Sequence, residues 1–116
     1  VNDNYGHATG DVVITALATL LRKRIRRTDK AGRYGGEEFL LILPDCTAAQ
    51  ARDMAGHILQ SFRRLHFSAD GVQFSCTFSA GVSSTSEGDF SNSEQMIGAA
   101  DEALYLAKRA GRDRVV

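Results

Sequence analysis

The chain has 116 residues, of which 43% are hydrophobic and 24% charged, with a single proline. This composition is that of one folded globular domain and excludes a disordered or low-complexity chain. Fourteen basic residues balance fourteen acidic ones, so no overall charge attracts the chain to nucleic acid or to an anionic membrane. Apolar runs such as Phe39 to Leu43 are far shorter than the ~20 residues of a membrane-spanning helix, and the polar start is unlike a signal peptide. We therefore expect a cytoplasmic domain with no membrane segment.

The first half of the chain predicts a helix followed by a hairpin. Apolar residues recur at spacings of three and four from Asp11 to Arg27, which is the pattern of an amphipathic helix. Gly35 and Gly36 predict a hairpin turn. The apolar run from Phe39 to Leu43, closed by Pro44, then predicts a buried strand.

The second half continues the alternation of helices and strands. Apolar periods of three to four or of two predict a helix, a strand, a helix and a last strand at residues 48–65, 72–82, 93–110 and 115–116. Residues 83–91 form a loop, and Gly111 stops the third helix. This order predicts a mixed α/β sandwich, in which helices pack on a sheet.

The turn at residues 33–39 has the composition of a phosphate site. Gly35 and Gly36 allow the backbone to approach a ligand closely, so a phosphate can lie against backbone amides. Glu37 and Glu38 follow directly, and carboxylates beside a phosphate can hold the Mg²⁺ that neutralises its charge. The alternative is a plain Gly-Gly hairpin with two solvated acids, and spacing alone does not decide between them.

Four separated motifs together resemble the GGDEF family of diguanylate cyclases. They are Asn2-Asp3-Asn4-Tyr5-Gly6-His7, Gly10-Asp11, Arg33-Tyr34-Gly35-Gly36-Glu37-Glu38-Phe39 and Ala100-Asp101-Glu102-Ala103-Leu104-Tyr105-Leu106-Ala107-Lys108. The motifs occur in the family's order and spacing over nearly the whole chain, and GGEEF is an accepted variant of the signature. The resemblance implies a single GGDEF domain over residues 1–116, with the nucleotidyl-cyclase, ferredoxin-like fold and a mixed, mainly antiparallel central sheet.

The resemblance also implies an enzyme that condenses two GTP molecules into cyclic di-GMP and pyrophosphate. Each domain of an antiparallel homodimer would hold one GTP, and the 3′-hydroxyl of one would attack the α-phosphate of the other with the help of Mg²⁺ or Mn²⁺. An upstream sensor or receiver domain is implied in the parent protein. Two alternatives remain: a non-catalytic regulatory domain that binds GTP or cyclic di-GMP, and a dimerisation module without a ligand.

By the same resemblance, Glu37 and Glu38 are the catalytic and metal-binding residues, with Glu37 also helping to deprotonate the attacking hydroxyl. GTP binding is assigned to six residues: Asn2, Asp11, Gly35, Gly36, Lys108 and Arg112.

Four of these GTP-binding assignments, all implied by the resemblance, also agree with the chemistry of a base or a phosphate. Asn2 and Asp11 would read the guanine edge, because a carboxylate accepts from guanine N–H groups and an amide complements the same base. Capping of the first helix is the other interpretation of Asp11. Lys108 and Arg112 would contact the outer phosphates, although cations at a helix C-terminus are also favourable without any ligand.

The segment Arg26-Arg27-Thr28-Asp29 resembles the family's RxxD inhibitory site. The resemblance implies that Arg26 and Asp29 bind the product cyclic di-GMP and so provide feedback inhibition. Guanidinium suits this task because its planar fork binds a phosphate or the acceptor edge of guanine in two places. A local ion pair between Arg26 and Asp29 is the competing interpretation. His57 stands where well-studied members have a further arginine, which predicts weaker product binding or another geometry.

Family members carry a strand and turn of the form DxDxFK just upstream of the Asn2-Asp3 motif, and this segment supplies a metal-binding Asp and a phosphate-binding Lys. The chain begins after it and without an initiator Met. We therefore expect a longer native protein, and we expect these 116 residues alone to form little or no cyclic di-GMP.

Overall fold

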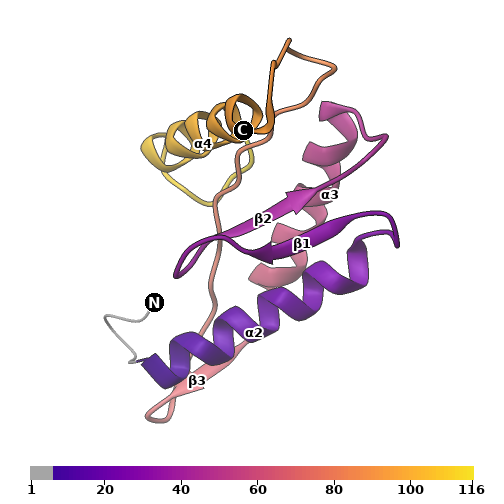
Figure 1. Cartoon of the computed structure of the whole chain (residues 1–116). Coiled ribbons are helices and arrows are strands. Elements are labelled where there is room, and N and C mark those ends of the chain that lie inside the picture. Colours follow the sequence, from indigo (N-terminus) through magenta and orange to yellow (C-terminus); the bar gives the residue numbers. More distant parts are fainter. Residues whose placement is uncertain (1–6) are drawn as a thin grey trace. The chain divides into compact units, whose positions relative to one another are not determined.

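The computed structural model describes the backbone of residues 7–116 and the side chains from Ala8 onwards (Figure 1). Helices and antiparallel strand pairs alternate, in the order α2 (His7–Arg24), β1 (Lys30–Arg33), β2 (Phe39–Ile42), α3 (Ala48–Arg63), β3 (Phe67–Ala69), β4 (Val72–Phe74) and α4 (Ser93–Arg109). The predicted mixed α/β class is confirmed. The strands form two separate two-stranded sheets, β1 with β2 and β3 with β4.

The chain divides into two compact units. The first comprises Val1–Pro44 and Gln60–Cys76, and the second comprises Asp45–Leu59 and Thr77–Val116. No helix among the described residues combines the length and the apolar character that crossing a bilayer requires.

Helix α2 of the first unit begins at His7, so the predicted start at Asp11 is wrong by one turn. Val13 and Leu21 are its buried apolar side chains, with 4% and 6% of their surface exposed. Its last turn carries three cations, Arg22, Lys23 and Arg24, which interact favourably with the negative end of the helix dipole.

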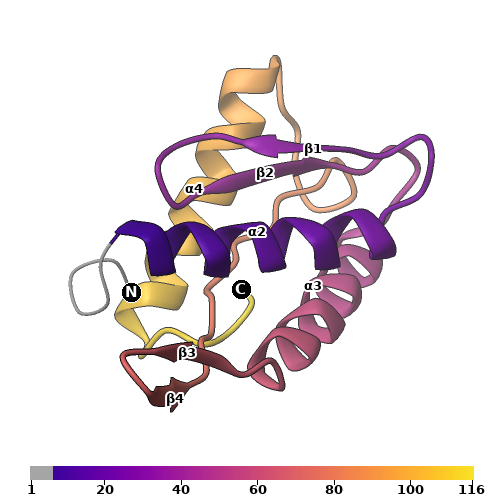
Figure 2. The same ribbon diagram turned by 90° about the horizontal axis from the view of Figure 1, so that it is seen from below.

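The β1–β2 hairpin has the predicted position but not the predicted burial. Its register pairs Lys30 with Ile42 and Arg33 with Phe39, and it lies alongside α2 in both views (Figures 1 and 2). Although the apolar run predicts a buried strand, none of the four residues of β2 is buried and Ile42 is 57% exposed. Among the described residues only β1 pairs with β2, so no second neighbouring strand covers it.

An aromatic cluster joins the end of α3 to the β3–β4 hairpin in the first unit. The buried ring of Phe62 meets that of Phe67 edge-on, with centroids 6.2 Å apart, and Phe67 meets Phe74 at 5.7 Å. The two strands that carry Phe67 and Phe74 are joined by Asp70 and Gly71, both with left-handed backbone, as in a tight hairpin turn. β3 is not predicted by the sequence pattern, although an Asp-Gly pair is a strong hairpin signal.

In the second unit, α3 and α4 begin at well-formed caps. Thr47 and Gln50 exchange backbone-to-side-chain hydrogen bonds of 3.0 and 3.2 Å, which is a capping box at the start of α3. The Asn92 side chain accepts a 2.9 Å hydrogen bond from the Gln95 N–H at the start of α4. These caps agree with the predicted helix starts.

The predicted strand over residues 72–82 is only partly correct. Residues 72–74 pair with β3, and further along Ala80 pairs with Val115 in parallel, through hydrogen bonds of 2.9 Å from Ala80 N–H to Arg114 O and from Val116 N–H to Ala80 O. Residues 75–79 have no strand partner in the described part of the chain. Alternation shows which side chains share a face, but a strand also needs a neighbour whose backbone completes the ladder.

Candidate functional site

The turn between β1 and β2 is closed by its own hydrogen bonds. The N–H groups of Tyr34 and Gly35 both donate to the Glu38 carbonyl, at 2.8 and 3.4 Å. The Arg33 guanidinium, just before the turn, donates to the Gly36 carbonyl. Sequence reasoning missed this role of Arg33, although the residue belongs to the same motif. This contact holds the Gly36 carbonyl toward Arg33 at the end of β1.

The two glycines of this turn are not required by the local fold. Neither has the left-handed φ that favours glycine, unlike Gly71 and Gly111. A Cβ atom on Gly36 would meet no atom within 4 Å, and one on Gly35 would lie 3.8 Å from the Glu38 side chain, an ordinary contact. What glycine supplies here is an uncovered backbone that a ligand can approach closely.

Glu37 and Glu38 are consecutive exposed acids on the same turn. No group of three or more His, Cys, Asp or Glu side chains that could hold a metal occurs in the described part of the chain. Two carboxylates suit Mg²⁺, which proteins usually bind through one or two carboxylates together with water and substrate phosphates. The two carboxylates therefore fit a cation that arrives with a nucleotide.

Asp11 is exposed and lies one turn inside α2. The capping interpretation of Asp11 is therefore wrong, because a cap residue precedes the first turn of its helix. The other predicted guanine-reading residue, Asn2, lies outside the described residues.

Lys108 lies in the last turn of α4 and Arg112 three residues after the helix ends, both in the second unit. Both are exposed. The chain turns after α4 through left-handed residues at Gly111 (φ 121°), Arg112 (φ 63°) and Asp113 (φ 52°). The Arg112 N–H donates to Ala107 O at 2.9 Å, which fixes the backbone of Arg112 against the last helical turn.

Arg26 and Asp29 hold each other in the loop after α2. The Asp29 side chain is 1% exposed and accepts from the Arg26 N–H at 2.7 Å and from the Arg26 Nη2 at 2.9 Å. These hydrogen bonds from the Arg26 side chain and backbone lower the pKa of the Asp29 carboxyl. The guanidinium also donates to Pro44 O and remains 52% exposed. The local ion pair is confirmed, and His57 lies exposed on α3 of the second unit.

Comparison with known proteins places these features in a family. Residues 1–114 match the family model of the diguanylate cyclase GGDEF domain. The chain belongs to the GGDEF domain family.

This GGDEF domain is similar to named diguanylate cyclases and to solved GGDEF structures. The chain is 39% identical over 115 residues to diguanylate cyclase A of Treponema denticola, and the match covers 99% of the chain but 31% of that protein. The GGDEF domain of DgcB from Caulobacter crescentus, solved in complex with c-di-GMP, superposes with a TM-score of 0.88 at 30% identity over 99% of this chain and 68% of that one. The active GGEEF domain of a diguanylate cyclase from Vibrio cholerae gives 0.76 at 31% identity over 98% and 71%. These neighbours confirm the GGDEF fold.

Proposed function

We propose that residues 1–116 form one diguanylate cyclase domain, which binds GTP at the β1–β2 turn and condenses it with the GTP of a second copy into cyclic di-GMP and pyrophosphate. The observation that carries the proposal is the pair of glycines whose backbone is open and whose own fold does not require them. Named diguanylate cyclases among the relatives support the same activity. GTP is a cytoplasmic nucleotide, so the activity places the domain in the cytoplasm.

In this proposal the turn binds phosphate through backbone and metal through side chains. The backbone of Gly35 and Gly36 lies nearest the phosphates, and Glu37 and Glu38 hold Mg²⁺. The metal, when bound, neutralises charge on the phosphates during the in-line displacement. Arg33 keeps the Gly36 carbonyl turned toward its own strand, so the turn is preorganised before nucleotide arrives.

The remaining predicted ligands divide between base and phosphate. Asp11, exposed and free of a capping role, accepts from guanine N–H groups together with Asn2. Lys108 and Arg112 neutralise the outer phosphates, and the fixed backbone of Arg112 limits the positions its guanidinium can take. Two copies of the domain bring two GTP molecules together as a homodimer.

We propose product binding at Arg26 and Asp29 as a second property of the domain. The exposed half of the Arg26 guanidinium can receive a phosphate or guanine while Asp29 holds the other half. That the related DgcB domain was solved with c-di-GMP supports a product site within the family. Feedback inhibition follows if the bound product holds the domain away from its partner. His57 supplies less charge than an arginine, so we expect weaker binding than in members that have both arginines.

Nuclear magnetic resonance of the backbone amides tests the GTP site. GTP with Mg²⁺ should shift the amides of residues 35–38, and ATP should shift them less. Glu37→Gln should weaken the metal-dependent part of the response, whereas Glu94→Gln, an exposed acid at the start of α4, is the matched control. Unchanged amide signals at saturating GTP would refute the proposal.

Calorimetry with cyclic di-GMP tests the product site. Arg26→Ala should abolish binding, while Arg27→Ala, which removes the neighbouring exposed cation, should leave it unchanged. Equal affinity of the two variants would contradict the assignment.

A further inference from the structure

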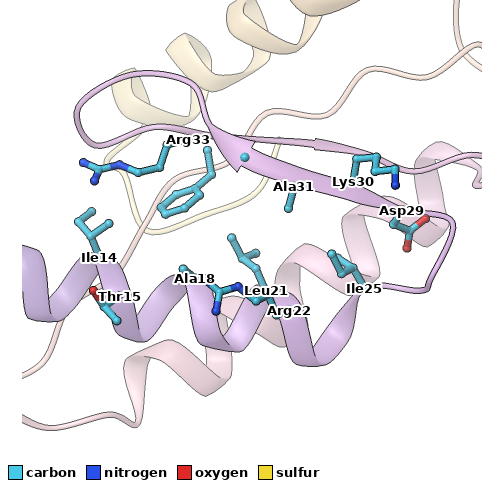
Figure 3. A pocket seen from close by; sticks show the side chains of 12 residues that line it. Ile14, Thr15, Ala18, Leu21, Arg22, Ile25, Asp29, Lys30, Ala31 and Arg33 are labelled. Carbon is cyan, nitrogen blue, oxygen red and sulfur yellow. The ribbon is translucent and has the colours of Figure 1, made fainter.

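A groove of about 530 Å³ lies between α2 and β1 in the first unit (Figure 3). Ile14 rises from the helix toward the hairpin, and Ala31 points back from the strand toward the helix. All four residues of β1 are exposed, so the hairpin does not close onto the helix beneath it. The volume lies within the ~300 to 1,000 Å³ of typical small-molecule sites.

The groove has an apolar floor. Its apolar lining comes from α2 and the residue after it, from β1 and from β2, and consists of Ile14, Ala18, Leu21, Ile25, Ala31 and Phe39. Leu21 is buried beneath the groove, whereas Ile14, Ala18 and Phe39 keep part of their surface accessible. Burying such surface against an apolar ligand releases water and stabilises the complex.

Cations make up most of the polar lining of the groove, and Thr15 and Asp29 complete it. Arg22, Lys30 and Arg33 are all exposed lining residues. Within the described residues, the side chains of Arg22 and Lys30 make no hydrogen bond or ion pair, and the side chain of Arg33 donates only to the Gly36 carbonyl. The lining contains one acid, Asp29, whose carboxylate is already paired with Arg26. The groove therefore carries positive charge that no lining residue neutralises.

We propose that this groove binds a small amphiphilic carboxylate, with its apolar chain over Ile14 and Ala18 and its carboxylate between Arg22 and Lys30. An uncharged apolar ligand would leave the cations without a partner, and a cationic one would be repelled. Charge-assisted hydrogen bonds from arginine and lysine favour an oxygen anion, and the apolar floor requires a hydrocarbon body. The groove adjoins the GGEEF turn through Arg33 and Phe39, but the proposed binding of a carboxylate does not depend on the proposed function.

Calorimetry with sodium decanoate, kept below its micelle-forming concentration, tests the proposal on this chain. Decanoate should bind with one-to-one stoichiometry, and decyltrimethylammonium, with the same chain and the opposite charge, should bind at least about tenfold more weakly. Arg22→Gln combined with Lys30→Gln should weaken decanoate binding about tenfold or more. Lys23→Gln is the matched control, because this cation of α2 is exposed but does not line the groove.

A second variant tests the apolar part of the groove. Ala18→Phe fills the space over the floor and should abolish binding, with circular dichroism to confirm folding. Val12→Phe adds the same ring at an exposed position outside the groove and should bind normally. No binding of decanoate to the parent chain, or equal binding by the cationic amphiphile or the charge-neutralised variant, would overturn the proposal. A change in the sedimentation of the Ala18→Phe chain, together with no binding of decanoate to the parent chain, would also overturn the proposal. That result would assign the groove to a second copy of the chain.

Discussion

Replacing Gly36 by alanine separates what the fold needs from what a ligand needs at the β1–β2 turn. The added methyl group meets no atom within 4 Å, and φ at this position is not left-handed. Alanine in a compatible conformation stabilises a protein by about 0.4 to 1 kcal/mol, because it restricts the unfolded chain. For a domain of this size we expect a Tm higher by about 1 to 5 °C.

The same methyl group should weaken nucleotide binding. If phosphate lies against the backbone at this residue, the methyl occupies space that the ligand uses. Overpacking by a methyl group costs about 1 to 3 kcal/mol, which corresponds to GTP affinity lower by about 5- to 150-fold. The Gly36→Ala chain should therefore be at least as stable as the parent and bind GTP more weakly.

Thermal unfolding by circular dichroism and calorimetric titration with GTP and Mg²⁺ measure the two effects. Gly32→Ala is the control, because Gly32 is on the same hairpin and also has open space and no left-handed φ. This control should gain stability and keep its GTP affinity. A loss of more than about 1 kcal/mol in Gly36→Ala would show that the fold needs the glycine, a result opposite to the gain expected from a compatible backbone. Unchanged GTP affinity would show that phosphate does not approach this backbone.

Three further predictions concern stability and are measured by urea unfolding. Gly81→Ala should destabilise strongly, toward or beyond the upper end of about 1 to 3 kcal/mol, because its Cβ would lie 2.2 Å from the Ala100 carbonyl oxygen on α4; a neutral effect would contradict the close packing. Phe62→Ala, which removes the most buried ring of the aromatic cluster, should cost about 3 to 5 kcal/mol, and a cost under ~1 kcal/mol would show that the site collapses or is already loose. Asp29→Asn should reduce stability at neutral pH, because the pKa of Asp29 is lowered by Arg26 in the folded state. That contribution is present above the ordinary carboxyl pKa of about 4 and is lost as pH falls through the lowered folded value, so the parent and the variant should converge in acid; parallel pH curves would refute the pairing.

The helices were largely predictable from the sequence, because apolar periodicity and local caps determine them. The capping pair Thr47 and Gln50 lies next to the start of α3 in the sequence, and Asn92 does so for α4. The predicted start of α2, Asp11, differs from the observed start, His7, because residues His7 to Gly10 carry no apolar period. A helix can extend beyond its apolar face.

The strands were less predictable, because pairing depends on distant backbone. The alternation over residues 72–82 correctly predicts where β4 begins, but only residues 72–74 and Ala80 have strand partners in the described part of the chain. For the candidate site, the Gly-Gly turn and its two acids were readable from the motif. The contact from Arg33 to Gly36 and the groove above α2 depend on how the hairpin lies on the helix, which no local pattern specifies.

The exposed apolar strand β2 has a practical consequence for work with the isolated chain. Phe39 to Ile42 keep part of their hydrocarbon accessible on both faces, and among the described residues only one edge of the strand is bonded, to β1. Such a strand can recruit the same strand of another molecule and begin a cross-β aggregate. Concentrated samples should therefore acquire thioflavin fluorescence on storage, and Ile42→Lys, which places a charge at the most exposed residue of the strand, should delay it.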